Sequence, residues 1–291
     1  MKRVFRFIYK IGVKLLTGTH ISKYSFIQKI IKKTNTILKP EFVEIEGNRI
    51  YLDKQDSLFL SIRGYHEKTA TRIAKEHIKE GDTVIDIGAN IGYYTLLFAK
   101  WVGPSGKVYA FEPEPSNFQL LEKNVEANNY ENITIFQKAV SDKNDKLSFY
   151  ISDESSAANQ LFKPKKFSKI IEVDSIKLDE FLPPDQKIDF IKIDIQGAEG
   201  TAIKGMNSLL EHNPNTIIMQ EWWPDAIKKY NMDSDEHLKI LEKLGYSFYE
   251  IDGQNDVLKQ IKINELIEKY PNKFFEDINL LCKNNNNEIH S

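Results

Sequence analysis

Residues 82–95, Asp-Thr-Val-Ile-Asp-Ile-Gly-Ala-Asn-Ile-Gly-Tyr-Tyr-Thr, read as a strand, a tight glycine turn and the start of a helix. The strand covers 83–86, and apolar residues continue with helical spacing over 93–101. The turn contains Gly88, Asn90 and Gly92. Glycine lets a ligand approach the main chain, and a helix N-terminus directs free N–H groups at that ligand. The stretch therefore predicts a turn that binds a nucleotide-like molecule.

Two acidic side chains indicate which molecule this is. The turn lacks the G-x-G-x-x-G pattern of dinucleotide folds, and Asp86 ends the strand beside it. A carboxylate there would repel a pyrophosphate but suits a ligand that carries a sulfonium and an ammonium group. Glu112 ends the next strand, 107–111, where it can accept both hydroxyl protons of a ribose. The pair indicates S-adenosylmethionine; the alternative is a plain strand-turn-helix in which Asp86 caps the helix and Glu112 is a solvated acid.

Length and composition limit the class of protein. With 291 residues the chain can bury a full core and reads as one large domain plus an extension, or at most two domains. A net charge of -2 gives no overall attraction for nucleic acid, which is therefore not expected as a partner. The single cysteine, Cys282, fits a reducing compartment, and no apolar run is long enough to span a bilayer. The N-terminus lacks a signal-peptide pattern, so a cytoplasmic location is expected.

Residues 1–38 form a separate segment that is basic, apolar and without acids. A helical wheel separates a cationic stripe from an apolar side, and residues 24–33 repeat this amphipathic pattern. The stripe consists of Arg3, Arg6, Lys10 and Lys14. The pattern is typical of a helix that lies in a membrane interface, which would place the protein at the inner face of a membrane. The alternative is an ordinary amphipathic helix packed on the domain with a solvated basic face.

The remaining chain predicts an α/β domain over 39–282, followed by a disordered, asparagine-rich tail at 283–291. A hairpin with a Gly47-Asn48 turn is expected at 42–52. The pattern predicts helices at 67–79, 115–129, 201–210, 234–244 and 263–269, and strands at 133–136, 189–195, 216–220, 246–251 and 278–282. Residues 147–173 interrupt the alternation of strands and helices and carry a lysine patch at 163–169. Such an insertion often contacts substrate, although a solvated lysine face is the more usual role.

Four motifs together resemble the FkbM family of S-adenosylmethionine-dependent methyltransferases, over roughly residues 65–223. They are the stretch 84–95, Phe-Glu-Pro at 111–113, Ala-Val-Ser-Asp at 139–142 and Lys-Ile-Asp-Ile-Gln-Gly-Ala-Glu at 192–199. The resemblance implies a Rossmann-like class I methyltransferase sheet, mostly parallel with one antiparallel strand near the C-terminal edge. The helical extension at 1–38 lies outside it.

The resemblance also assigns cofactor contacts. It implies that the methionine part of the cofactor is surrounded by Asp86, Gly88, Asn90 and Gly92, and that Glu112 holds the ribose. Glu67 resembles an acid that the family often carries before its first helix, where it would reach the cofactor's amino group. Ser141 lies where an adenine pocket is expected, although its segment could equally form only turns. No role is transferred to His66.

Methyl transfer to a hydroxyl needs an aligned acceptor and benefits from a general base. The candidate bases are Asp194 first, then Glu199 and Glu221, at the predicted carboxyl ends of neighbouring strands. Lys192 could pair with one of them and keep it ionised. Glu199 alternatively stabilises a helix N-terminus through the dipole. Three acids could also bind a divalent metal, but no ligand motif supports one and none is expected.

Members of the family mostly methylate hydroxyl groups on sugars, polyketides and other small molecules. The substrate does not follow from the family, but the four motifs together with the basic segment 1–38 lead us to expect O-methylation of a glycan or lipid-linked saccharide. Trp222 and Trp223 either stack on a sugar face or pack in the core. The alternatives are methylation of a soluble small molecule or an amine, and a non-catalytic membrane-peripheral module on the same fold. A nicotinamide oxidoreductase is disfavoured because Asn90 replaces the second fingerprint glycine.

Overall fold

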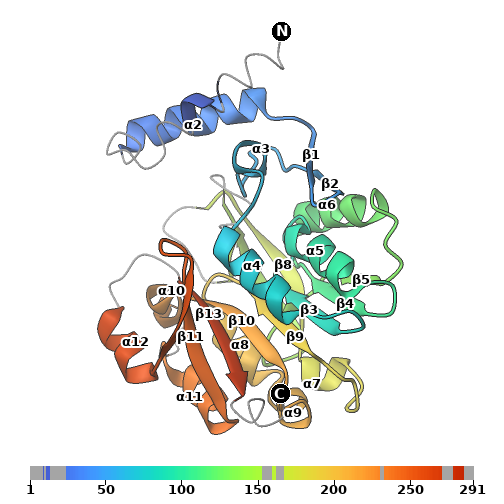
Figure 1. Cartoon of the computed structure of the whole chain (residues 1–291), viewed down its shortest axis with the longest axis vertical. Helices are drawn as coiled ribbons and strands as arrows, with labels where there is room; N and C mark the ends of the chain where they lie inside the picture. The colour runs from blue at the N-terminus through green and yellow to red at the C-terminus, as the bar shows by residue number, and fades with distance from the viewer. Residues whose placement is uncertain are drawn as a thin grey trace.

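The computed structural model describes Tyr9 and residues 11–13, 24–152, 159–161, 167–229, 233–270 and 278–284. Its centre is an eight-stranded sheet with the order β12-β11-β13-β10-β9-β3-β4-β5 (Figure 1). The strands are β3 Thr83–Ile87, β4 Lys107–Phe111, β5 Ile133–Phe136, β9 Phe190–Ile193, β10 Ile217–Trp222, β11 Tyr246–Asp252, β12 Val257–Ile261 and β13 Ile278–Asn284.

The order of the strands confirms the Rossmann-like methyltransferase sheet. Strands β5, β4, β3, β9 and β10 are parallel, and β13 inserts antiparallel between β10 and β11. The expected antiparallel strand is therefore β13, and β12 adds a second one at the edge. The chain order reverses between β3 and β9, and the carboxyl ends of parallel strands form a crevice at such a point.

Helices cover both faces of the sheet, so its central strands are buried on both sides. Neighbouring residues of β3 show this, because Val84 packs in one core cluster and Ile85 in the other. The first face carries α4 Lys68–His77, α5 Tyr93–Val102 and α6 Pro115–Glu126. The second carries α7 Leu178–Phe181, α8 Glu199–Lys204, α9 Asn207–His212, α11 Glu236–Lys243 and α12 Ile263–Lys269. Helix α10 Pro224–Lys229 follows β10 and was not predicted.

Two smaller sheets flank this core. The predicted hairpin is β1 Phe42–Ile45 and β2 Asn48–Tyr51, but its turn is Glu46-Gly47, because Asn48 pairs with Ile45. The insertion after β5 forms a second sheet from β6 Ala139–Val140, β7 Asp145–Ile151 and β8 Lys169–Ile176. Most of the predicted lysine patch, 163–166, lies outside the described residues.

Two expectations, one about a helix and one about the C-terminal tail, were wrong in detail. The helix expected at 201–210 is split into α8 and α9, because Gly205 packs against Ser141, whose carbonyl oxygen would lie 1.9 Å from an added Cβ atom. Lys283 and Asn284, expected in a disordered tail, belong to β13. Asn284 is buried and donates a hydrogen bond to the carbonyl of Leu244.

The N-terminal extension is described mainly by α2 Ser25–Leu38, which precedes the hairpin, and a short helix, α3 Leu60–Arg63, follows the hairpin. Figure 1 shows α2 at one end of the molecule, beyond α3 and away from the central sheet. The residues of the predicted cationic stripe, Arg3, Arg6, Lys10 and Lys14, lie outside the described part of the chain. Within the described ranges, no helix has the length and apolar character that a bilayer crossing requires.

Candidate active site

A cavity of about 260 Å³ opens at the carboxyl ends of β3, β4, β9 and β10, where the strand order reverses. Ten residues were proposed for cofactor binding or catalysis. Five of those expected to contact the cofactor line this cavity: Glu67, Asp86, Gly88, Asn90 and Glu112. Asp194 and Glu221, expected to act in catalysis, line it as well. Seven of the ten candidate residues therefore lie around one cavity at the predicted edge of the sheet.

The glycine turn owes its sequence mainly to packing within the fold. Gly88 has a φ of +84°, and a Cβ atom there would lie 2.0 Å from the carbonyl oxygen of Asp194. Gly92, with a φ of +90°, would meet the side chain of Leu121 at 2.7 Å and does not line the cavity. Gly88 also lines the cavity, which agrees with a glycine that lets a ligand approach, whereas Gly92 does not reach it. Both glycines allow β9 and α6 to pack closely against the turn.

The two strand-end acids lie at one cavity and are both buried. Asp86 accepts a 2.6 Å hydrogen bond from the hydroxyl of Thr95, and its Oδ1 has no partner among the described residues. Burial raises the pKa of Asp86. The N-cap of α5 is Gly92, which has no side chain to cap the helix, and Asp86 contacts the first turn of α5 through Thr95, so the helix-capping alternative for Asp86 stays open.

Glu112 is fixed by the chain around it. It accepts backbone N–H hydrogen bonds from Asn90 and Glu114, both 2.9 Å long, and a longer one from the amide of Asn117. Burial raises the pKa of Glu112 to about 7. With a residue exposure of 5%, it is not the solvated acid of the alternative interpretation.

Glu67 marks a third corner of the cavity, at the N-cap of α4. Its carboxylate accepts hydrogen bonds from the hydroxyl of Tyr94, at 3.0 Å, and from the amide of Asn279, at 2.5 Å. His66 lies beside it, with its Nε2 3.7 Å from Oε2 of Glu67. Burial lowers the pKa of His66 below its ordinary value, which favours a neutral imidazole at neutral pH. Strand β13 thus fixes a residue that precedes it by 212 positions.

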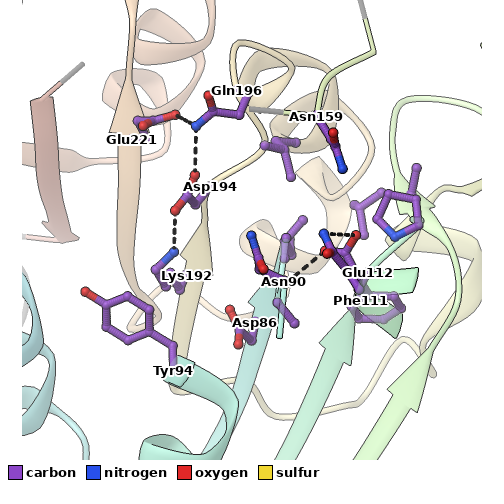
Figure 2. A pocket seen from close by; sticks show the side chains of 18 of the residues that line it. Asp86, Asn90, Tyr94, Phe111, Glu112, Asn159, Lys192, Asp194, Gln196 and Glu221 are labelled. Carbon is purple, nitrogen blue, oxygen red and sulfur yellow. Dashed lines mark hydrogen bonds and ion pairs between the residues drawn. The ribbon is translucent and has the colours of Figure 1, made fainter. Parts of the chain in front are cut away.

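A chain of polar side chains runs along the opposite wall, from β9 to β10 (Figure 2). Lys192 pairs with Asp194 at 3.0 Å and lies 4.5 Å from the centre of the Tyr94 ring. The amide of Gln196 donates hydrogen bonds to Asp194, at 3.3 Å, and to Glu221, at 2.9 Å. Gln196 has a φ of +57°, which turns the backbone sharply after β9. The carboxylates of β9 and β10 are therefore linked through one amide.

The charges of this wall depend on each other. Burial opposes the charge on Lys192, but the surrounding carboxylates, Asp194 first, raise its pKa above the ordinary value. Burial likewise opposes the charge on Asp194, and the ammonium of Lys192 lowers the pKa of Asp194 below its ordinary value. In the sheet, Lys192 is the register partner of Asp86. One buried ammonium thus interacts with Asp86 on β3 and with Asp194 on the opposite wall of the cavity.

Comparison with known proteins identifies the family. A family model described as the methyltransferase FkbM domain matches residues 86–248, more than half of the chain. The chain belongs to the FkbM methyltransferase family. This confirms the resemblance carried by the four motifs, and S-adenosylmethionine is the cofactor that accompanies it.

Individual relatives of this FkbM protein are distant. Methyltransferase 1 of Beauveria bassiana is 24% identical over 145 residues, which are 43% of this chain and 58% of that protein. The chain therefore matches little more than half of that relative's length. The hexuronic acid methyltransferase of Haloferax volcanii is 27% identical over 199 residues, with 66% of this chain and 78% of that protein covered. The crystal structure of an S-adenosylmethionine-dependent O-methyltransferase from Thermotoga maritima gives a TM-score of 0.43 at 14% identity, over 86% of this chain and 80% of that one.

The residues of this FkbM domain fit the cofactor. Buried acceptor atoms without partners in the described part of the chain, Oδ1 of Asp86 and Oδ1 of Asn90, belong to residues that line the cavity. A ligand with an ammonium group and hydroxyl groups supplies the donors that such acceptors lack. A carboxylate offers about four acceptor positions, and the three donors on Glu112 leave one for a ribose hydroxyl.

Two further candidates do not reach the cavity. Glu199 is buried below the turn, where its Oε1 accepts backbone N–H hydrogen bonds from Ile195 and Gly197. Glu199 therefore stabilises the turn after β9. It lies in the first turn of α8, as in the alternative role of an acid at a helix N-terminus. Ser141 is buried away from the lining, and its hydroxyl donates to Asp142 at 3.3 Å. The neighbouring Val140 lines the cavity in its place.

Several lining residues were not singled out from the sequence. Tyr94 follows the glycine turn, and three come from the insertion: Phe149, Asn159 and Leu161. The break in β-α alternation was the only signal for the last three. Trp222 is fully buried and donates a hydrogen bond to Ser234, and neither tryptophan lines the cavity. Among the residues that the structure describes, no group of three or more His, Cys, Asp or Glu side chains is arranged to hold a metal.

Proposed function

We propose that this FkbM-family protein transfers the methyl group of S-adenosylmethionine to a hydroxyl oxygen of a saccharide. One observation carries the proposal: Asp194, whose carboxylate follows β9 directly and is 27% exposed, lines the cofactor cavity and is held ionised by Lys192. A hydroxyl group is a weak nucleophile at neutral pH, and a carboxylate within reach can accept its proton. When bound, the cofactor supplies a methyl group that its sulfonium activates.

The residues at the ends of β9 and β10 have different roles in this proposal. Asp194 accepts the hydroxyl proton as the acceptor oxygen bonds to the methyl carbon and the carbon–sulfur bond breaks. The electron pair of that bond stays on sulfur. Gln196 holds Asp194 and Glu221 in position through its two hydrogen bonds and leaves the chemistry to the carboxylate. A fixed base in a pre-formed cavity contributes alignment, which is the main requirement of an in-line displacement.

A saccharide suits the polar groups at the wall and the insertion. Glu221, Gln196 and Asn159 all line the cavity and offer carboxylate and amide groups for neighbouring hydroxyls. The similarity to a hexuronic acid methyltransferase supports a sugar as the class of acceptor. A membrane surface as partner rests on α2 and not on the cavity. An amine, another small molecule or a non-catalytic role are outcomes that the following experiment separates.

The test uses purified full-length protein, S-adenosylmethionine labelled in its methyl group and a panel of neutral saccharides. Asp194→Asn keeps the shape of the side chain but removes the proton acceptor, so turnover should fall at least about 100-fold. Cofactor binding, measured by calorimetry, should persist. Asp174→Asn on β8 is the matched control, because that carboxylate is half exposed and lies outside the cavity lining. Full turnover by Asp194→Asn, or label found only on amines, would reject the proposal.

A further inference from the structure

Helix α2 exposes an apolar face. Phe26 is 71% exposed, Ile37 67% and Ile30 46%, although all three are large apolar side chains. At about 3.6 residues per turn they fall within about 40° of one another around the helix. The α2 face, defined by Phe26, Ile30 and Ile37, is therefore a continuous stripe and not a scatter of single residues.

The opposite side of α2 is fixed to the domain. Asn35 is buried, donates a 2.9 Å hydrogen bond to Asp56 and accepts a 3.0 Å hydrogen bond from the hydroxyl of Ser61. The backbone N–H of Ser61 also donates to Asp56, at 3.1 Å. A helix attached by a polar contact and exposing its apolar stripe is the reverse of an amphipathic helix that packs on a core. The orientation of α2 thus directs the apolar stripe away from the domain, where an external surface can contact it.

The composition of the N-terminal segment indicates what that is. Residues 1–40 contain ten lysines and arginines and no acid, whereas the remainder of the chain contains 30 basic and 42 acidic residues. Lys33 of α2 is exposed beside the stripe. Two copies of this segment would repel each other through like charge. An anionic lipid surface, in contrast, offers an apolar layer for the stripe and head groups for the cations.

We propose that the α2 face docks on an anionic lipid bilayer and brings the mouth of the cavity to that surface. The link is short, because Asp56 lies two residues before Leu58, and Leu58 lines the cavity. The docking does not depend on the chemistry of the cavity. Its consequence for the acceptor, a saccharide carried at a lipid surface, rests on the proposed function.

The test compares the wild-type protein with the triple variant F26S/I30S/I37S in co-sedimentation with vesicles. One set of vesicles is rich in phosphatidylglycerol, and the other contains phosphatidylcholine alone. The control, I170S/V257S, removes two similarly exposed apolar side chains from β8 and β12. Cofactor binding by calorimetry shows that each variant is folded.

The wild type and the control should bind the anionic vesicles, with weaker binding as salt rises. The triple variant should bind them at least about tenfold more weakly. Equal binding of the wild type and the triple variant, or no preference of the wild type for anionic vesicles, would overturn the proposal. So would a dimer, detected by sedimentation velocity, that only the triple variant loses. Transfer to a water-borne saccharide should be unchanged in the triple variant, and its absence in both proteins would count against the proposed function and not against docking.

Discussion

Gly88→Ala tests whether the glycine turn and the end of β9 are packed as the structure shows. The added Cβ atom would lie 2.0 Å from the carbonyl oxygen of Asp194 and 3.0 Å from its carbonyl carbon. Real Cβ atoms stay at least about 3 Å from such neighbours, so the ends of β3 and β9 must separate by about 1 Å. The same ends are joined by a 3.0 Å hydrogen bond from the N–H of Asp194 to the carbonyl of Ile87.

The expected loss of stability has two parts. A residue with a Cβ atom in the left-handed region costs about 1–2 kcal/mol. Forcing a methyl group into a packed interior costs about 1–3 kcal/mol more. Gly88→Ala should therefore lower the free energy of unfolding by about 2–5 kcal/mol. Because the displaced turn lines the cofactor cavity, the affinity for S-adenosylmethionine should fall about 10- to 100-fold.

Urea unfolding and calorimetry with S-adenosylmethionine measure the two effects, and the chain supplies two controls. Gly64 has a φ of +76° with open space around it, so Gly64→Ala should show only the backbone cost of about 1–2 kcal/mol. Gly253 has neither constraint, and Gly253→Ala should change stability by less than about 0.5 kcal/mol. If Gly88→Ala behaved like Gly64→Ala and bound the cofactor normally, the close contact with Asp194 would be wrong.

The other predictions concern charge. Lys192→Met removes the cation that lowers the pKa of Asp194, so the acid limb of the kcat/KM pH profile should move to higher pH; an unmoved limb would contradict the pairing. Glu112→Gln puts an NH₂ group where the carboxylate accepts two N–H groups, so the Kd for the cofactor, measured by calorimetry, should rise at least about 10-fold. An unchanged Kd would show that Glu112 does not contact the cofactor. Burial raises the pKa of Glu199 from 4.5 to about 7, so the folded chain binds this proton more tightly than the unfolded chain. Protonation of Glu199 therefore stabilises the fold fully below about pH 4.5, and this stabilisation is lost as the pH rises through 7. Glu199→Gln should therefore flatten the dependence of urea midpoints on pH, because it removes a fall of up to about 3 kcal/mol in the free energy of unfolding. The variant should retain turnover, and loss of turnover would restore Glu199 as a catalytic candidate.

Local patterns made the core of the site predictable. Asp86 lies near the carboxyl end of β3 and Glu112 directly follows β4, and parallel strands bring their carboxyl ends to one edge of a sheet. The same rule placed Asp194 and Glu221 at the cavity, although Glu221 lies within β10 and not after it. It failed for Glu199, because a side chain one turn further on can fold back to the backbone N–H groups of its own loop.

Contacts between distant parts of the chain could not be predicted. Nothing in the sequence around Glu67 indicates that Asn279 of β13 will hold its carboxylate. The close approach of Asp194 to Gly88 likewise depends on how two strands meet, and the glycine alone suggested a ligand. The amphipathic pattern of α2 predicted two faces but not which one is attached, since a polar anchor, Asn35, decides that. Tertiary contacts of this kind override local preference.

A crystal structure of the protein with S-adenosylhomocysteine would test most directly the claim that Asp86 and Glu112 hold the cofactor between two strand ends. We expect ribose hydroxyls within hydrogen-bond distance of the Glu112 carboxylate and the amino group of the ligand facing Asp86 or Glu67. A nucleoside bound elsewhere, or a Glu112 carboxylate that touches only its own backbone donors, would contradict it.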